Sequence, residues 1–306
     1  MQAAAQAFRK VHPREFYERF IAEGVRPDGR ALTAAREVSI TPAAVSKADG
    51  SAMVRLGDTM VLATVRAEVT RAALETPGCG RLAINLVLTP LASPAVRAGR
   101  PNDAAAAISN RLDRIVASSE VVRLQDLAVG DVAEGLVWIL YCDLYCLDYD
   151  GNVTDAAMLA LLAALQDTTL PVLEAADEVA GELVVAPDAP PRPLALQQVP
   201  ATLSFGVVGT HIVADPTLQE EGLAGSIDVD AALLGGGAIE VGTTCDSFTV
   251  VTDEDGRLGG VHKAGGSALT DAQLRECIEL ARLRGSAMRH LLEQAATGHK
   301  QWASNT

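Results

Sequence analysis

The stretch VWILYCDLYCLDYDGN, residues 137–152, decides the fold of this 306-residue chain. Apolar Trp138 and Leu140 alternate with residues of the opposite face, a period of two that predicts a β-strand over 137–147. The acidic, glycine-containing end of the stretch predicts a turn. The alanine- and leucine-rich residues 155–166 then predict a helix that is apolar nearly all round and therefore buried. A strand that passes directly into a buried helix is typical of a mixed α/β core.

Strand and helix patterns continue on both sides of this stretch. Toward the N-terminus we predict a helix over 1–24, followed by a Pro-Asp-Gly turn and a meander of strands between 36 and 68. Toward the C-terminus we predict a helix over 270–295, in which Thr270 and Gln273 form a capping box. The remaining elements are strands at 82–88, 201–208 and 211–214, a hairpin at 248–262 and a helix at 103–119.

A proline-rich segment, APDAPPRP at 186–193, is the best candidate for a boundary within the chain. Strands followed by a helix occur on both sides of it, which points to a duplicated unit. We therefore predict an α/β (α+β) fold of two βαβ-type halves with mixed sheets and packed helices. The predicted divisions are an N-terminal helix and turn at 1–30, a first half at 31–185, the linker at 186–193, a second half at 194–298 and a tail at 299–306.

The charge of the chain restricts its possible roles. A net charge of −14 and a pI near 4.8 have the wrong sign for a protein that binds nucleic acid by itself. Any RNA contact must therefore come from a local basic patch or from partner proteins. The five cysteines are odd in number and scattered, which favours reduced thiols in an intracellular protein over a disulfide framework.

Two groups of carboxylates follow predicted strands. Asp215, Glu220 and Glu221 could hold Mg²⁺ or act as acid and base, and the alternative is a solvated acidic turn. The second group lies at the strand-to-helix turn. There Asp155 is placed to favour the helix N-terminus through capping and the helix dipole, a structural role that we favour over catalysis.

Four arginines are candidate phosphate ligands. Arg111 and Arg114 lie within one helical turn, and Arg97 and Arg100 flank a loop of glycine and proline. The alternative for these side chains is a solvated, charged face. In so acidic a chain, however, clustered arginines are the plausible contacts for RNA.

Residue types that commonly bind metals or cofactors do not form the required patterns. Cys142 and Cys146 point to one face of a strand, where they fit small core residues better than zinc ligands. The five histidines lie in separate segments, and the glycine-rich stretches lack the spacing of a phosphate-binding loop. We expect no metal and no cofactor.

In their order and number, the motifs of this chain resemble those of the RNase PH family, and within it the non-catalytic ring subunits of the eukaryotic RNA exosome. The resemblance covers roughly residues 14–295. Its motifs are Phe16–Phe20 leading into Arg26–Arg30, Ala48–Thr59, Trp138–Asn152 followed by Asp155-Ala156, Asp215–Thr217 with Glu220-Glu221, and His262–Ser267.

The resemblance also implies a degenerate phosphorolytic site. Active members degrade RNA from its 3′ end with inorganic phosphate, and they carry a phosphate-gripping arginine just after the Asp-Gly turn. Here that place is Thr154, whose neutral hydroxyl cannot supply a guanidinium's charge-assisted contact. Active members also carry an aspartate six residues beyond the equivalent of Asp215, and here that place is Glu221. The two departures predict a chain that keeps the RNase PH-like fold but is not an enzyme.

By resemblance we expect a structural subunit of the hexameric exosome ring, which supports 3′–5′ RNA processing and degradation by forming the RNA channel and docking partner subunits. The implied partners are other RNase PH-like ring subunits, RNA-binding cap subunits, an associated 3′–5′ exonuclease and single-stranded RNA, with no membrane. The implied localisation is nucleus, nucleolus and cytoplasm. Arg97, Arg100, Arg111 and Arg114 would contact RNA, and residues 223–247 would form a surface insertion.

Two other functions stay open. The first is an active, phosphate-dependent 3′–5′ exoribonuclease with an unusual site. The second is a small-molecule enzyme of related α/β topology, such as a kinase, although its expected glycine-rich phosphate loop is missing from the sequence.

Overall fold

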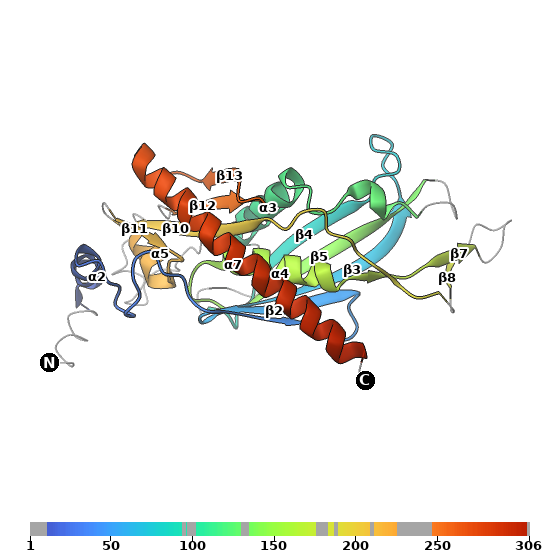
Figure 1. Cartoon of the computed structure of the whole chain (residues 1–306), viewed down its shortest axis with the longest axis horizontal. Coiled ribbons are helices and arrows are strands. Elements are labelled where there is room, and N and C mark those ends of the chain that lie inside the picture. The colour runs from blue at the N-terminus through green and yellow to red at the C-terminus, as the bar shows by residue number, and fades with distance from the viewer. Residues whose placement is uncertain are drawn as a thin grey trace.

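A computed structural model describes residues 11–93, 96, 102–129, 135–175, 183–186, 189–208, 211–224 and 247–304. Within these residues the strands form two larger sheets, one from each predicted half (Figure 1). The first sheet has the order β1–β2–β3–β5–β4, and all its pairs are antiparallel except β4 with β5. Its strands are β1 (Val38–Pro42), β2 (Gly50–Leu56), β3 (Thr59–Arg71), β4 (Arg81–Leu88) and β5 (Leu136–Asp148).

The second sheet has four antiparallel strands in the order β11–β10–β12–β13. Its strands confirm the predictions for 201–208, 211–214 and the hairpin at 248–262. They are β10 (Ala201–Val208), β11 (His211–Ala214), β12 (Ser247–Thr252) and β13 (Leu258–Lys263).

The described helices are α2 (Pro13–Ala22), α3 (Asp103–Ser118), α4 (Val153–Asp167), α5 (Leu218–Ala224) and α7 (Asp271–Ser304), with a 3-10 turn η1 (Leu124–Leu127). Of the helix predicted over 1–24, residues 13–22 are confirmed, and residues 1–10 lie outside the described residues.

The capping box of the C-terminal helix is confirmed. The Gln273 amide donates to Thr270 Oγ1 over 3.3 Å, and the Thr270 amide donates to Gln273 Oε1 over 3.0 Å. The end of this helix was predicted too early, because α7 runs to Ser304 and the predicted tail is helical over 299–304. Gly298 lowers helix stability by only about 1 kcal/mol and keeps its backbone N–H, so the helix passes through it.

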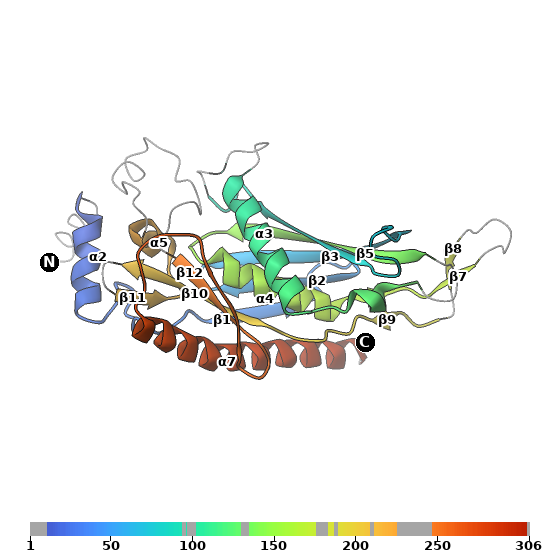
Figure 2. The ribbon, with the colours of Figure 1, turned by 90° about the horizontal axis from the view of Figure 1, so that it is seen from above.

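Helix α4 is the centre of the main core. Thirteen of its residues, 153–165, are buried. It packs against β2, β3 and β5 on one side and against β10 and α7 on others. In Figure 2, α4 lies between α7 and strands β3 and β5. An alanine- and leucine-rich sequence with no polar stripe suits this position, because every face of the helix meets apolar side chains.

The two halves share this core. Helix α7 crosses both sheets (Figure 1) and places Met288 and Leu292 in the same apolar cluster as Leu140 of β5. The predicted linker is also tied to the body, because β9 (Arg192–Pro193) pairs with β6 (Thr169–Leu170). A short hairpin of β7 (Leu173–Ala175) and β8 (Leu183–Val185) projects from the end of the molecule.

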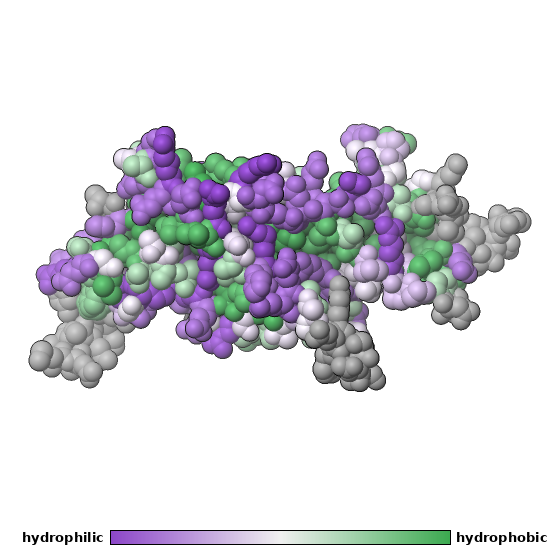
Figure 3. All heavy atoms as spheres, viewed as in Figure 1, coloured by the Kyte–Doolittle hydropathy of each residue, from purple (hydrophilic) through white to green (hydrophobic). Residues whose placement is uncertain are grey.

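The outer surface of α7 is largely hydrophilic on the face shown in Figure 3, with apolar patches beside it. Among the described residues, no helix combines the length and the apolar character that crossing a membrane requires.

Candidate functional site

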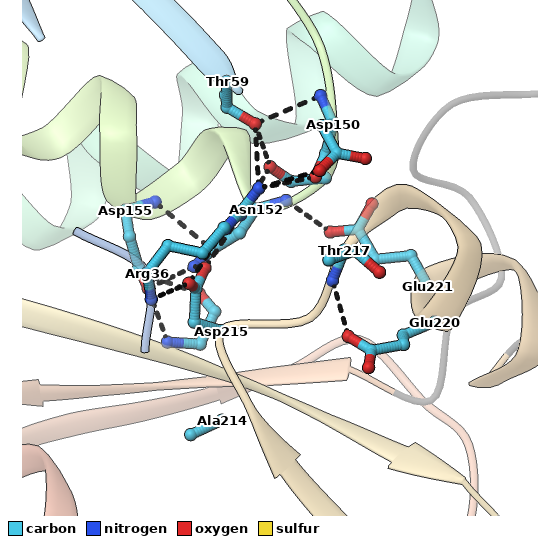
Figure 4. Close-up of polar contacts among 12 residues, drawn as sticks. Arg36, Thr59, Asp150, Asn152, Asp155, Ala214, Asp215, Thr217, Glu220 and Glu221 are labelled. Atoms are coloured by element: carbon cyan, nitrogen blue, oxygen red, sulfur yellow. Dashed lines mark hydrogen bonds and ion pairs between the residues drawn. The ribbon is translucent and has the colours of Figure 1, made fainter. Parts of the chain in front are cut away.

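The predicted site residues meet where the two halves join. The turn between β5 and α4 lies against the turn that follows β11 (Figure 4). Gly151 allows this approach, because a Cβ atom there would lie 2.5 Å from the Leu218 nitrogen and 2.5 Å from the Thr217 carbonyl carbon. Its φ of +80° also favours glycine.

Asp215 is at the centre of the junction and is only 1% exposed. Arg36 grips its carboxylate through two hydrogen bonds, from Nε to Oδ2 at 2.9 Å and from Nη2 to Oδ1 at 2.8 Å. The Arg36 backbone amide donates to Oδ2 at 2.8 Å, and Asn152 Nδ2 donates to Oδ1 at 2.7 Å. Burial alone would raise the pKa of Asp215, but the Arg36 hydrogen bonds and charge, with Asn152, hold that pKa below its ordinary value.

Arg36 also binds the β5–α4 turn. Its Nη1 donates to the Asp150 carbonyl at 2.8 Å, and its Nη2 donates to the Gly151 carbonyl at 3.2 Å. The hydroxyl of Thr59 donates to the same Gly151 carbonyl at 2.7 Å. Arg36 therefore connects the start of the first sheet, the β5–α4 turn and the second half.

Asp155 links α4 to β10 instead of capping α4. The cap is Asn152, whose Oδ1 accepts from the Asp155 amide, so the predicted capping by Asp155 is wrong, whereas its predicted place in the first turn of α4, where the helix dipole favours an acidic residue, is confirmed. The buried carboxylate of Asp155 accepts from the Ser204 amide at 2.8 Å, the Ser204 hydroxyl at 2.9 Å and Asn152 Nδ2 at 2.8 Å. Burial raises the pKa of Asp155 despite these donors.

Glu221 holds the β5–α4 turn from the other side. Its Oε1 accepts from the Asn152 amide at 2.7 Å, and its Oε2 accepts from the Tyr149 hydroxyl at 2.7 Å. Desolvation of the carboxyl group raises the pKa of Glu221, and this effect outweighs the two hydrogen bonds.

Glu220 is 1% exposed and binds the turn that follows β11. It accepts from the Thr217 amide at 2.8 Å and forms an ion pair with Arg26 at 3.5 Å. Arg26 is itself buried, and burial lowers its pKa to about 10. The expectation of a solvated acidic turn is therefore wrong for Asp215 and Glu220, since the chain folds both carboxylates inside and pairs them with arginines.

The remaining predicted site residues lie beside this junction or outside the described residues. Thr154, 7% exposed, occupies the buried first turn of α4. Arg111 of α3 is half-buried. Burial lowers the pKa of its guanidinium, although the negative charges of Asp155 and Glu221 act in the opposite direction. Arg97, Arg100 and residues 225–246 of the predicted insertion lie outside the described residues.

Cys142 and Cys146 are core residues, as the strand pattern predicts. Both are buried on the α4 side of β5, and burial raises the pKa of each thiol to about 12.

The sequence reasoning missed Arg36, Asn152 and Ser204 as members of the junction. Asn152 carried a usable signal, because asparagine directly before a helix is a common N-cap. Arg36 and Ser204 carried none, since their partners lie 179 and 49 residues away along the chain.

Comparisons with known proteins agree with this fold. Residues 34–171 match domain 1 of the 3′ exoribonuclease family, RNase PH, and residues 198–283 match its domain 2. The exosome complex component Rrp42 of Thermococcus gammatolerans is 32% identical over 90% of this chain and 92% of its own length. The exosome complex component rrp43 of Schizosaccharomyces pombe is 29% identical over 90% of this chain and 93% of its own length.

Solved structures give the same result. The Archaeoglobus fulgidus exosome with RNA bound to the active site contains a chain with a TM-score of 0.73 and 29% identity. The match covers 90% of this chain and 96% of that one. A chain of an archaeal exosome core matches with a TM-score of 0.70 and 25% identity, over 92% and 96% of the two chains. With its RNase PH-like fold and both matching domains, the chain belongs to the 3′ exoribonuclease family.

Proposed function

We propose that this chain is a non-catalytic, structural subunit of an exosome ring and supports 3′–5′ RNA processing and degradation without cleaving RNA itself. The observation that carries the absence of catalysis is the state of the two carboxylates, Asp215 and Glu221. Both oxygens of each carboxylate accept hydrogen bonds from side chains and amides of the β5–α4 junction or of Arg36.

A carboxylate that binds a catalytic metal or moves a proton needs an oxygen that can reach the substrate. Both oxygens of Asp215 already accept at least two hydrogen bonds each, and the side chain is 1% exposed. Both oxygens of Glu221 are also bonded, to Asn152 and Tyr149. Thr154 adds no positive charge that could hold phosphate. These groups hold two halves of a fold together, which is a structural task.

The role in a ring is supported by the relatives. Proteins named as exosome complex components match 90% of this chain, and the structural neighbours are exosome cores, one with RNA bound. We propose RNase PH-like ring subunits, cap subunits and an associated 3′–5′ exonuclease as partners. Single-stranded RNA would meet the arginines at 97, 100, 111 and 114. We also propose that the protein is located in the nucleus, the nucleolus and the cytoplasm. Fluorescence microscopy of the tagged chain tests this localisation.

Affinity purification of the tagged chain from its own cells tests the ring assignment. We expect stoichiometric recovery of other RNase PH-like chains, identified by mass spectrometry. Recovery of none of them, with a well-folded bait, would contradict the proposal.

The absence of catalysis has its own test in Thr154→Arg. We expect this variant to stay inactive in phosphorolysis, because one guanidinium does not release the bonded carboxylates of Asp215 and Glu221. Activity of the single variant would show that only this position keeps the site silent.

A further inference from the structure

The helices that pack on the first sheet lie on one of its two faces. The strand residues Val54, Val61 and Cys146 point to this face and lie in one apolar core with helix α4. Helices α3 and α7 add Leu112 and Leu292 to the same core. In Figure 2, α4 and α7 lie on the same side of β3 and β5. Within the described ranges, α3, α4 and α7 therefore form a single layer against this sheet.

The opposite face of the sheet, which we name the outer face, has a continuous row of mainly apolar side chains. Directly opposed residues of paired strands point to the same face, and neighbours along a strand point to opposite faces. One row of the outer face therefore contains one residue from each strand, namely Thr41, Met53, Leu62, Tyr145 and Val87. The last four are half-buried and partly accessible. A sheet face that meets only water normally has polar side chains, so this row indicates contact with another molecule.

The residues around this row are of types that protein interfaces favour. Aromatic residues, methionine and arginine are enriched at such interfaces relative to the rest of the surface. The outer face adds Met60, Tyr141, Arg55 and Arg66 to the row. The Arg66 guanidinium lies 5.3 Å from the centre of the Tyr141 ring. The turn before β2 closes one corner of the face, where its backbone bonds to the Ser51 hydroxyl.

The outer face has the area that a stable interface needs. Its five strands are 5 to 13 residues long. With strands about 4.8 Å apart, about nine residues long on average and rising about 3.3 Å per residue, the face measures about 24 Å by 30 Å, or roughly 700 Å². A specific protein complex buries about 800 Å² of each partner. The outer face therefore matches, in size, one side of a standard interface.

A partner of the same fold has the complementary shape. Such a chain has its own five-stranded sheet with helices on one face, and therefore an open face at the same place. Two sheets pack face to face about 10 Å apart, with their side chains interlocked. A second copy of this chain would bring another net charge of −14, and repulsion between like charges opposes self-association. The charge therefore favours a different chain of the same fold.

We propose that a different RNase PH-like chain packs on the outer face of the first sheet, sheet against sheet, with Met53, Leu62 and Tyr145 at the centre of the contact. The inference rests on the proposed ring role and adds to it the contact face and the type of partner surface. Leu62 lies on β3, the middle strand of the five. Residues at the centre of an interface contribute most to binding, so a change at Leu62 should weaken the contact strongly.

The first experiment is photocrosslinking in the assembled complex. The photoreactive amino acid p-benzoylphenylalanine replaces Tyr145 in the full-length tagged chain, which is expressed in its own cells, illuminated and affinity-purified. We expect a covalent product with another RNase PH-like chain, identified by mass spectrometry. The same amino acid at Leu283, which is 72% exposed on α7, is the control on the helical side and should give no product with that chain.

The second experiment is Leu62→Glu, which places a charge at the centre of the face. Recovery of the neighbouring chain should fall at least about tenfold, because the carboxylate would be buried without a partner in the complex. Leu283→Glu makes the same change at an exposed position and should leave recovery unchanged. The urea midpoint of isolated Leu62→Glu should stay close to that of the wild type, since the side chain points away from α4. If this variant does not fold, the Tyr145 crosslink decides.

Two results would overturn the inference. One is normal recovery of RNase PH-like chains with no crosslinked product from Tyr145, or with no loss in folded Leu62→Glu. The other is a Tyr145 product with a second copy of this chain or with RNA, which would assign the outer face to that molecule. If the wild type recovers no RNase PH-like chain at all, the proposed ring role itself fails, so the two failures are distinguishable.

Discussion

Replacing Asp215 with asparagine should destabilise the fold strongly if Asp215 is structural. Asparagine keeps the shape of the side chain and tolerates the positive φ of +50° found at this residue, so backbone strain does not enter. The substitution removes only the negative charge that Arg36 binds through Nε and Nη2 at 2.9 and 2.8 Å. It leaves Arg36, which is 8% exposed, without its main partner.

Breaking a buried pair by removing one partner costs about 3–5 kcal/mol. Single domains have a total stability of about 5–15 kcal/mol, so this loss is a large share of the free energy of unfolding. Urea denaturation followed by circular dichroism measures it as a lower midpoint. The control is Asp58→Ala, since the Asp58 side chain is 76% exposed and its ion pair with Arg55 should contribute at most about 1 kcal/mol.

A loss below about 1 kcal/mol for Asp215→Asn would refute the structural reading. Catalytic residues held in strained or repelling sites commonly give unchanged or higher stability when they are replaced. If the asparagine variant does not fold, Arg36→Lys gives a milder version. It keeps the charge and loses the two-pronged contact, for an expected cost of about 1.5–3 kcal/mol.

Three further predictions concern pH, the glycine approach and the thiols. Folding lowers the pKa of Asp215. Its contribution to the free energy of unfolding is therefore complete above its unfolded pKa, near 4, and is lost as the pH falls through the lower, folded pKa. The difference in stability between the wild type and Asp215→Asn should be constant at neutral pH and should shrink in acid. Gly151→Ala should cost more, by about 1–3 kcal/mol in thermal or urea unfolding, than Gly29→Ala, because both have positive φ but only Gly151 meets neighbouring backbone. Cys142 and Cys146, with pKa values of about 12, should resist a thiol reagent at pH 8 until the protein unfolds, and fast labelling of the native chain would contradict their placement.

The sequence predicted secondary structure well where one period dominates. The alternating pattern of β5 fits a strand, and the unbroken apolar run of α4 fits a helix that is buried on every side, so each pattern indicates one type of element. The end of α7 was missed since residues 296–304 contain no proline and no second glycine, and nothing local stops the helix.

The sequence pointed to some residues of the candidate site, Asp215, Glu220 and Glu221, but not to their partners or their burial. Asp215 and Glu220 follow a strand beside Pro216, and that pattern alone is typical of a solvated turn. Their burial depends on two distant arginines. Arg36 binds Asp215 from 179 residues away, and Arg26, ten residues earlier in the chain than Arg36, pairs with Glu220. Such pairings arise from tertiary packing, and no periodicity or turn signal in a single sequence reports them.

The most direct test of the central claim is phosphorolysis by the purified chain. Single-stranded RNA, inorganic phosphate and Mg²⁺ are incubated with the wild type, and nucleoside diphosphates are measured by chromatography. The account predicts no release above a protein-free control, because Asp215 and Glu221 are bonded within the fold and position 154 has no charge. Phosphate-dependent release that disappears in Glu221→Gln would contradict it.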